Sequence, residues 1–276
     1  MLRASFELTY ACNFACRHCY VPPDFPRKYR KKQLSTAGVL SVLDQLKGLG
    51  CLYLGFTGGE PFMRPDIFKI LAYARSQGFE VIIYTNGSLI DAVAAKALAR
   101  LRLNKVDITL PAMTEETFDL ITGTSGMRAK VFAAITALHS QGVPLGFKTC
   151  LVKENKKEIR AISGFARSLK AEYRLSTSIL PCLDGNTQPL QYAYTAEAGM
   201  AKRFPAVSHK YGCILCPETH PSDCGAATTQ AAVTPAGEMK LCVLRHQPLY
   251  KLLGSDASVQ WRRLRAYQSN KLCLRK

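Results

Sequence analysis

The chain has 276 residues, of which 47% are apolar and 21% charged, and it carries a formal net charge of +17. This composition is that of a folded protein and excludes a disordered chain, and no apolar run reaches the roughly eighteen residues of a membrane-spanning helix. The start lacks the basic stretch and apolar core of a secretory signal, so we expect a cytoplasmic protein whose eleven cysteines stay reduced. Clustered cysteines in that compartment indicate metal binding or catalysis rather than disulfides.

Short β-rich runs alternate with amphipathic helical segments over most of the chain. Ser35 is a suitable cap for the first long helix, and Gly78 and Gly142 suit chain reversals after helices. This alternation predicts parallel βα units, an α/β fold and a sheet that curls towards an incomplete six-stranded barrel. Strands are expected at 4–10, 52–56, 80–85, 105–110, 144–152 and 174–180, and helices at 36–48, 66–77, 91–101, 128–141 and 155–170.

The pattern changes near residue 186. The segment AAVTPAGEMKLCV (231–243) predicts a β-hairpin with a Pro-Ala-Gly turn, and SVQWRRLRAYQ (258–268) predicts a short helix. We therefore expect two domains, a barrel over residues 1–186 and a small C-terminal domain over residues 187–276.

Three cysteines follow the first expected strand. The stretch LTYACNFACRHCYVPP (8–23) contains Cys12, Cys16 and Cys19. Four thiolates would close a zinc site or a 4Fe–4S cluster, whereas three leave one iron open for chemistry. The alternative is a zinc site in which His18 completes the ligand set.

A glycine-rich segment, FTGGEPFMRPDI (56–67), follows the second expected strand. Gly58 and Gly59 allow the backbone to approach a ligand closely, and the carboxylate of Glu60 suits an ammonium group. Both features lie at strand ends, where parallel α/β folds place their sites.

The cysteine spacing, the aromatic Tyr20 after Cys19 and the Gly-Gly-Glu-Pro segment together resemble the radical S-adenosylmethionine (SAM) superfamily. The resemblance implies a partial (βα)6 TIM-like barrel and a [4Fe–4S] cluster on Cys12, Cys16 and Cys19, whose open iron chelates SAM. Pro111 departs from the family pattern, since many relatives carry an Asp-Gly pair in this region. The cofactor contacts implied by the resemblance are Tyr20, Gly58, Gly59, Glu60, Thr85, Asn86, Thr109 and Lys148.

The segment CGAATTQAAVTPAGEMKLC (224–242) is similar to the opening of the SPASM and twitch extensions of that superfamily, which carry auxiliary iron–sulfur clusters. The further cysteine run of a full SPASM extension is missing, so we expect one auxiliary [4Fe–4S] cluster. The alternatives are a structural zinc built on Cys213 and Cys216, and plain buried thiols. Candidate ligands are Cys216, Cys224, Cys242 and Cys273, with Cys213 competing for the first place.

The remaining cysteines and the histidines receive simpler interpretations. Cys51 and Cys150 lie in or beside apolar strands and are expected in the core. Cys182 follows the sixth strand and is expected to be a thiol that binds no metal. No histidine is assigned a catalytic role.

The resemblance implies reductive cleavage of SAM to methionine and a 5′-deoxyadenosyl radical, which abstracts hydrogen from the substrate. The sequence around SILPCLDGN (178–186) and the compact tail look similar to maturases of ribosomally made peptides, which form thioether or carbon–carbon cross-links. A basic surface would suit an acidic leader peptide, bound by the barrel or with a leader-binding partner protein, and flavodoxin or ferredoxin would donate electrons. The basic run RKYRKK (27–32) is itself interpreted as a solvated loop.

Two other functions compete with peptide maturation. The first is cofactor biosynthesis on a tetrapyrrole or pterin. The second, of a different class, is a non-catalytic basic iron–sulfur protein that binds nucleic acid. The sequence shows no evident nucleic-acid motif, and the Gly-Gly-Glu-Pro segment would then be unexplained.

Overall fold

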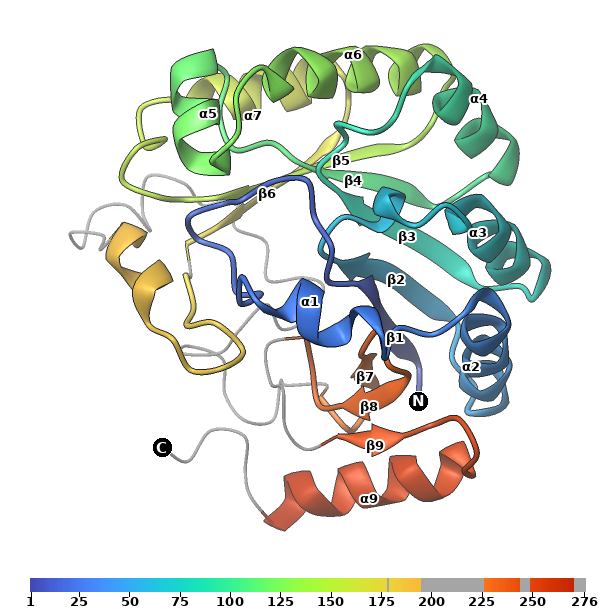
Figure 1. Cartoon of the computed structure of the whole chain (residues 1–276). Coiled ribbons are helices and arrows are strands. Elements are labelled where there is room, and N and C mark those ends of the chain that lie inside the picture. Colours follow the sequence, from blue (N-terminus) through green and yellow to red (C-terminus); the bar gives the residue numbers. More distant parts are fainter. Residues whose placement is uncertain (178, 195–225, 244–248, 271–276) are drawn as a thin grey trace. The chain divides into compact units, whose positions relative to one another are not determined.

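The computed structural model describes residues 1–177, 179–194, 226–243 and 249–270, in which strands and helices alternate along the chain (Figure 1). The strands are β1 (Arg3–Thr9), β2 (Tyr53–Gly58), β3 (Glu80–Thr85), β4 (Lys105–Thr109), β5 (Leu145–Cys150), β6 (Glu172–Ser176), β7 (Gln230–Val233), β8 (Glu238–Lys240) and β9 (Tyr250–Lys251). The α-helices are α1 (Phe25–Arg30), α2 (Thr36–Gly48), α3 (Ile67–Ser76), α4 (Ala92–Leu101), α5 (Glu115–Thr122), α6 (Met127–Ser140), α7 (Ile159–Ser168) and α9 (Ala257–Asn270), and the 3-10 helices are η1 (Pro61–Met63) and η2 (Gln188–Tyr192).

The first compact unit comprises Met1–Cys12, Pro23–Ile83 and Gly212–Lys276. Its described strands follow the order β3-β2-β1-β7-β8-β9. The β3–β2, β2–β1 and β1–β7 pairs are parallel, and β7–β8 and β8–β9 are antiparallel. The buried rings of Phe6 in β1 and Phe56 in β2 lie in register with their centroids 6.3 Å apart, at the centre of the core of this unit.

The second compact unit comprises Asn13–Pro22 and Tyr84–Tyr211. Its strands β4, β5 and β6 pair in parallel, in that order. The ring of Phe147 in β5 packs on Phe165 of α7, which in turn contacts Phe132 of α6. Because side chains alternate across a strand, Gly146, Lys148 and Cys150 of β5 lie on the face turned away from these helices.

The observed elements confirm the α/β class expected from the sequence. Six strands alternate with helices as predicted, and the tail contains the predicted hairpin, β7–β8, and helix, α9. Ser35 caps α2 by accepting a hydrogen bond from the backbone N–H of Gly38, as expected. In the described part of the chain, no helix is long and apolar enough to cross a membrane.

The main differences from the predicted elements concern α1, α5 and β6, and no helix was expected where α5 (Glu115–Thr122) lies. The run RKYRKK was interpreted as a loop, but residues 25–30 form α1 because Phe25 and Tyr29, four residues apart, are both buried against Tyr10. Strand β6 covers Glu172–Ser176, so it begins two residues before and ends four residues before the predicted strand, 174–180. The domain boundary predicted near residue 186 stays a prediction, because residues 195–225 lie outside the described chain.

Candidate functional site

The cysteine loop follows β1 and has no helix or strand of its own. The Cys12 side chain is exposed, and Cys16 and Cys19 are partly exposed, within reach of solvent. The backbone N–H of Cys19 donates to the carbonyl of Cys16 over 3.1 Å, which turns the chain between the last two cysteines. No group of three or more His, Cys, Asp or Glu side chains within the described residues is arranged to hold a metal ion, so the ligand set stays a prediction.

Two of the predicted cofactor residues fasten this loop on one side. Asn86 Nδ2 donates to Asn13 Oδ1 over 2.9 Å, and Asn13 Nδ2 donates to Ser88 Oγ over 2.8 Å. Thr85 Oγ1 accepts a hydrogen bond from the backbone N–H of Gly87. Thr85 and Asn86 are both largely buried. The Thr-Asn-Gly segment after β3 therefore has an observed structural task, holding the residue that follows Cys12.

The end of α5 fastens the same loop on a second side. The N–H groups of Ala15 and Arg17 donate to the last carbonyls of α5, at Thr122 and Ile121, over 2.9 and 3.0 Å. Gly123 ends that helix with φ +64°, and a Cβ there would lie 2.7 Å from the carbonyl oxygen of Ala15. The helix and the cysteine loop thus meet backbone to backbone.

The chain after β6 makes the third attachment. The N–H of Leu183 donates to the Tyr20 carbonyl over 2.8 Å, and the Cys182 thiol lies 3.5 Å from the Cys19 carbonyl. Burial raises the pKa of Cys182, which keeps its thiol protonated at neutral pH. The Cys182 thiol therefore supports the cysteine loop, and its expected lack of a bound metal stays a prediction.

In the first unit, the Gly-Gly-Glu-Pro segment lies directly against the end of β1. The N–H of Gly59 donates to the Thr9 carbonyl over 2.7 Å, and the N–H of Glu60 donates to the Ala11 carbonyl over 2.8 Å. A Cβ on Gly58 or Gly59 would lie 2.1 or 2.2 Å from a carbonyl oxygen of that segment. Both glycines are therefore needed for the close approach of two stretches of backbone, whatever else they contact.

The Glu60 side chain is fully buried. Its Oε1 accepts from the N–H of Phe62 over 3.0 Å and so caps η1. Arg64 adds a second fixed point, since its guanidinium donates to the carbonyls of Leu8 and Leu34 and pairs with Asp66. A buried carboxylate held in one orientation can stabilise an ammonium group brought to it.

The face of β4–β6 turned away from the helices carries a row of polar side chains. Thr109 in β4 pairs with Lys148 in β5, which pairs with Arg174 in β6. Arg174 was not predicted from the sequence. Its guanidinium binds the carboxylate of Asp107, a residue with 2% exposure. The sequence KVDITL indicates only that Asp107 shares a face with Thr109, two residues later. The pairing with Arg174 depends on strand register.

Gly146 allows these charges to meet across the sheet. It lies opposite Asp107 in β4 and Glu172 in β6, and a Cβ there would lie 2.8 Å from Lys105 Cδ. Lys105 pairs with both Asp107 and Glu172. Lys105, Asp107 and Glu172 form a charged network that lies closer to the amino ends of the strands than Thr109 and Lys148 do.

Pro111 does not disturb the end of β4. Its carbonyl accepts from Asn155 Nδ2 over 2.9 Å, and the carbonyl of Leu110 accepts from Thr149 Oγ1 over 2.7 Å. Asn155 is fully buried and also donates to the Cys150 carbonyl. This asparagine was not predicted from the sequence, and it links the loops after β4 and β5.

Cys150 differs from the expectation that it lies in the core. It is partly exposed at the end of β5, because it shares the face of Lys148 rather than that of Phe147. Partial burial alone would raise its pKa, but the charge and hydrogen bond of His18, with help from Lys148, lower the pKa to about 7. Cys51 is in the core as predicted, and burial raises its pKa to about 12.

The tail supplies one described candidate ligand. Cys242 follows β8 and is partly exposed, and Gly237 makes the predicted tight turn with φ +74°. The other candidates, Cys213, Cys216, Cys224 and Cys273, lie outside the described residues.

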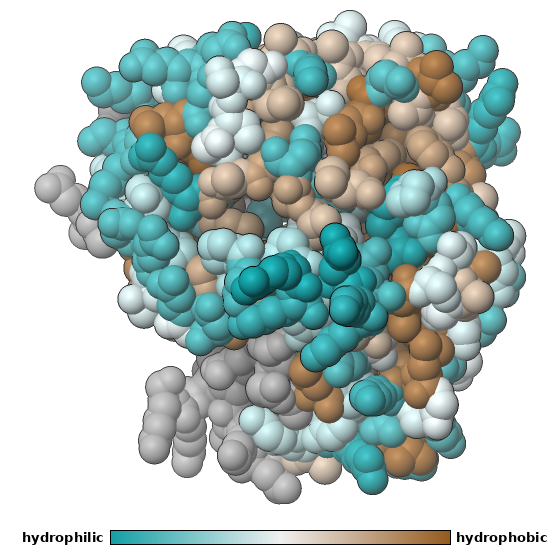
Figure 2. Space-filling model, viewed as in Figure 1, coloured by the Kyte–Doolittle hydropathy of each residue, from teal (hydrophilic) through white to brown (hydrophobic). Residues whose placement is uncertain are grey.

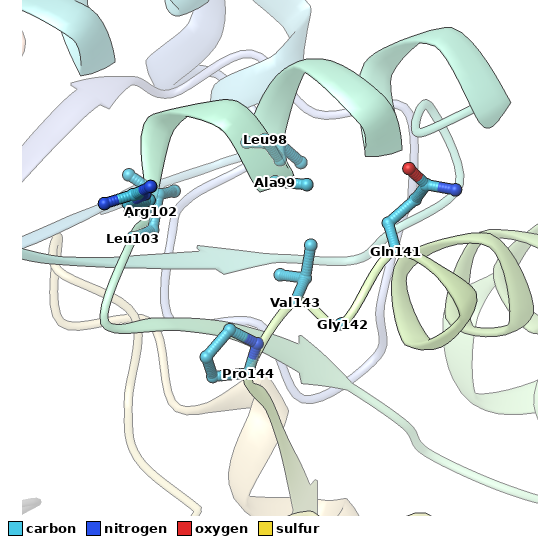
Figure 3. Close-up of a pocket in the computed structure, with 8 residues that line it drawn as sticks. All are labelled: Leu98, Ala99, Arg102, Leu103, Gln141, Gly142, Val143 and Pro144. Atoms are coloured by element: carbon cyan, nitrogen blue, oxygen red, sulfur yellow. The ribbon is translucent and has the colours of Figure 1, made fainter.

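A small cavity of about 230 Å³ lies elsewhere in the second unit, between the end of α4 and the segment before β5 (Figure 3). Its only side chains with polar ends are Arg102 and Gln141, and the rest of its lining is apolar or glycine. It lies at the amino ends of β4 and β5. Parallel α/β folds bind ligands at the opposite ends of their strands, so this cavity is not the candidate site.

The chemical groups of the predicted site residues suit an iron–sulfur cluster and SAM. Three cysteine side chains come from one loop that is anchored at three places, and thiolates are the usual ligands of iron–sulfur clusters. Glu60 offers a carboxylate for an ammonium group, and Lys148, which has no ion pair within the described chain, offers a cation for a carboxylate.

Comparison with known proteins agrees with this arrangement. The family model described as the Radical SAM superfamily matches residues 6–166. The PqqA peptide cyclase of Gluconobacter oxydans is 32% identical over 60% of this chain and 46% of its own length. The Fe-coproporphyrin III synthase of Methanosarcina barkeri is 34% identical over 57% of this chain and 39% of its own length. The chain therefore matches less than half the length of these curated relatives.

Among solved structures, SuiB of Streptococcus suis superposes with a TM-score of 0.69 over 96% of this chain and 67% of SuiB. At 16% identity this likeness shows the fold, and it confirms the partial barrel expected from the sequence. SuiB has also been solved with S-adenosylmethionine and with its precursor peptide SuiA.

Proposed function

The chain belongs to the radical SAM superfamily of enzymes, and from that premise we propose that it cleaves SAM and modifies a peptide substrate. The observation that carries the proposal is the cysteine loop, which is anchored at three places and whose preceding strand lies against the Gly-Gly-Glu-Pro segment. When bound, a [4Fe–4S] cluster and SAM supply the one-electron chemistry that yields a 5′-deoxyadenosyl radical. The protein contributes binding, orientation and the exclusion of water.

In this proposal Cys12, Cys16 and Cys19 hold the cluster. Gly58, Gly59 and Glu60 bind the amino group of SAM, with Glu60 supplying the compensating charge. Lys148 binds the carboxylate of SAM, and Thr109 lies beside it in the adjacent strand. Tyr20, Thr85 and Asn86 complete the proposed set of cofactor residues.

A peptide substrate is favoured by the basic surface as well as by the similarity to a peptide cyclase. Helix α1 and the residues after it expose Arg27, Lys28, Arg30, Lys31 and Lys32, and Figure 2 shows strongly hydrophilic atoms over this helix. Lys28 pairs with Asp24, whereas within the described chain no ion pair involves the other four. Such a surface suits an acidic leader segment, bound by the barrel itself or together with a leader-binding partner protein.

The second candidate function is the biosynthesis of a tetrapyrrole or pterin cofactor, which the similarity to Fe-coproporphyrin III synthase supports. The two candidates are separated by incubating the anaerobically reconstituted protein with SAM, a reductant and either the short peptides encoded beside its gene or coproporphyrin. A peptide that loses two hydrogens while 5′-deoxyadenosine forms would establish the peptide function. Turnover of coproporphyrin alone would replace it with the cofactor function.

We also propose one auxiliary [4Fe–4S] cluster in the tail, on Cys216, Cys224, Cys242 and Cys273, with Cys213 competing for the place of Cys216. Its support is the sequence similarity and the observed hairpin, which ends at Cys242. The reconstituted protein should hold about eight irons, and replacing Cys12, Cys16 and Cys19 together by Ala should remove about half. Iron near four in the unaltered protein, with zinc in the tail, would reject this cluster.

The proposed function also requires an electron donor, such as flavodoxin or ferredoxin, and a compartment in which thiols stay reduced, for which we propose the cytoplasm.

A further inference from the structure

A lysine and a glutamate form an ion pair that has no contact with solvent inside the first unit. Glu7 in β1 and Lys240 in β8 are both 0% exposed, and Lys240 Nζ lies 2.7 Å from Glu7 Oε2. Removing two charges from water is costly, and apolar residues of similar volume often stabilise a fold as well or better. Stability alone does not explain why this pair is present.

The register of the sheet brings the two residues together. Ser5 in β1 pairs with Ala232 in β7, and Ala232 pairs with Lys240 in β8, so the three form one row. Glu7 follows Ser5 by two residues and therefore lies on the same face. Because Ala232 has only a methyl group, the lysine chain can extend across β7 to reach β1.

Hydrogen bonds continue from the pair in both directions. Tyr10 Oη donates to Glu7 Oε2 over 2.9 Å, and Lys240 Nζ donates to the Val243 carbonyl over 3.2 Å. Glu7 Oε1 is buried and has no hydrogen-bond partner among the described residues, where the carboxylate makes its hydrogen bonds through Oε2. Tyr10 is held by the edge of Tyr29, with ring centroids 4.9 Å apart.

The two ends of this chain of contacts adjoin the two segments proposed to hold clusters. Tyr10 precedes Cys12 by two residues, and Val243 directly follows Cys242. A buried path of hydrogen bonds therefore joins the strand that leads into the cysteine loop with the end of the hairpin.

We propose that Glu7 and Lys240 are positioning residues that fix where the hairpin presents Cys242 relative to the end of β1. The proposal rests on the auxiliary cluster proposed above. Lys240 binds the Val243 carbonyl and Glu7 together, so it holds the backbone beside the ligand while being anchored to the barrel strand. Hydrogen bonds to charged groups are stronger than those between neutral groups, which suits a fixed link.

The test is the double variant Glu7→Gln, Lys240→Met, which roughly keeps the side-chain volumes and removes both charges from this buried position. We expect its melting temperature to stay within a few degrees of the parent. Hydrogen exchange at residues 238–243 should become at least tenfold faster, and a chelator should remove iron from one of the two clusters at least tenfold faster. SAM cleavage without substrate should stay within twofold. Lys105→Met with Glu172→Gln, a partly exposed pair in the second unit, is the matched control and should change neither rate.

Exchange at residues 238–243 and iron release both within twofold of the parent would overturn the proposal. If the double variant does not fold, Tyr10→Phe decides, because it removes one donor to Glu7 and leaves the ion pair in place. In that variant an exchange rate at least threefold faster supports the link, and an unchanged rate overturns it. If the parent protein holds no iron in its tail, the proposal of an auxiliary cluster is wrong. The hydrogen-exchange rates of residues 238–243 would still decide whether the ion pair positions the hairpin.

Discussion

Glu60 combines an observed structural task with a proposed binding task. Its carboxylate has no exposed surface and caps η1 through the N–H of Phe62. The backbone of the same residue is tied to Ala11, one residue before Cys12. A charge fixed in this way already has one defined orientation before an ammonium group binds, which is what a binding site gains from preorganisation.

Replacing Glu60 by Gln should weaken SAM binding by about tenfold or more, because a charge-assisted contact of about 1.5–3 kcal/mol becomes a neutral one. The amide oxygen of Gln can still accept from Phe62, so the melting temperature and the iron content should stay close to those of the parent. Calorimetric titration with SAM measures the effect. An unchanged dissociation constant would remove Glu60 from the proposed SAM contacts.

Cys150 should be the most reactive thiol outside the proposed ligand sets. Its pKa is lowered to about 7, whereas burial raises the pKa of Cys51 to about 12 and also raises that of Cys182. The thiolate is the reactive form, so alkylation of Cys150 should rise with pH, reach half its maximum near pH 7 and level off above pH 8. Mass spectrometry after brief treatment of the reconstituted protein with iodoacetamide gives the profile. Cys150→Ser is the control, and a half-maximum above pH 8.5 would show that His18 does not act on this thiol.

At the scale of elements, the structure depends on short backbone contacts between segments that carry the proposed site. The segment 58–60 meets the end of β1, and the end of α5 meets the cysteine loop at Ala15. Contacts of this kind leave no room for a side chain, so they make individual glycines indispensable.

Gly59→Ala tests the first contact. Its Cβ would lie 2.2 Å from the carbonyl oxygen of Ala11, and relieving that overlap should cost about 1–3 kcal/mol of unfolding free energy. Iron content should fall as well, because Ala11 adjoins Cys12. The matched control is Gly164→Ala inside α7, where no atom lies within 4 Å of the new Cβ. That change should instead add about 0.5–1 kcal/mol, as measured by denaturant unfolding. Equal stability of the two variants would contradict this account of the contact.

The sequence predicted those elements whose local pattern and tertiary position agree. Helix α2 begins at Thr36 and ends at Gly48 as expected, because its cap and its apolar face indicate the same bounds. Helix α1 was missed because the run was interpreted from its charges alone. Its two aromatic anchors are stabilised by Tyr10, which directly follows β1. Similarly, motif residues such as Glu60 could be named from the sequence. Arg174 and Lys240 could not, because their partners are defined by strand register.

The net charge of +17 is evident from the composition. Several of the basic residues lie on or directly after helix α1. Arg27, Lys31 and Lys32 are exposed on or directly after α1, with no ion pair in the described chain, although the ammonium group of Lys32 lies over the ring of Tyr29. The buried rings of Phe25 and Tyr29 fix the helix to the first unit. The cations therefore form a fixed surface rather than a flexible run.

Neutralising Arg27, Lys31 and Lys32 together to Gln should weaken binding of an acidic peptide by about tenfold at low salt, since each exposed ionic contact contributes about 0.2–1 kcal/mol. The loss should shrink as ionic strength rises, because screening already limits such contacts to about 8 Å at 0.15 M salt. The control is the triple change of Lys96, Arg100 and Lys130 to Gln, which removes the same charge from exposed positions in the second unit. Fluorescence anisotropy with a labelled ten-residue oligoglutamate peptide, over a range of salt concentrations, separates the two sets. Equal losses in both variants would mean that the net charge of +17, and not the surface of α1, attracts the peptide. A loss confined to reduction by flavodoxin, with peptide binding intact, would assign this surface to the electron donor.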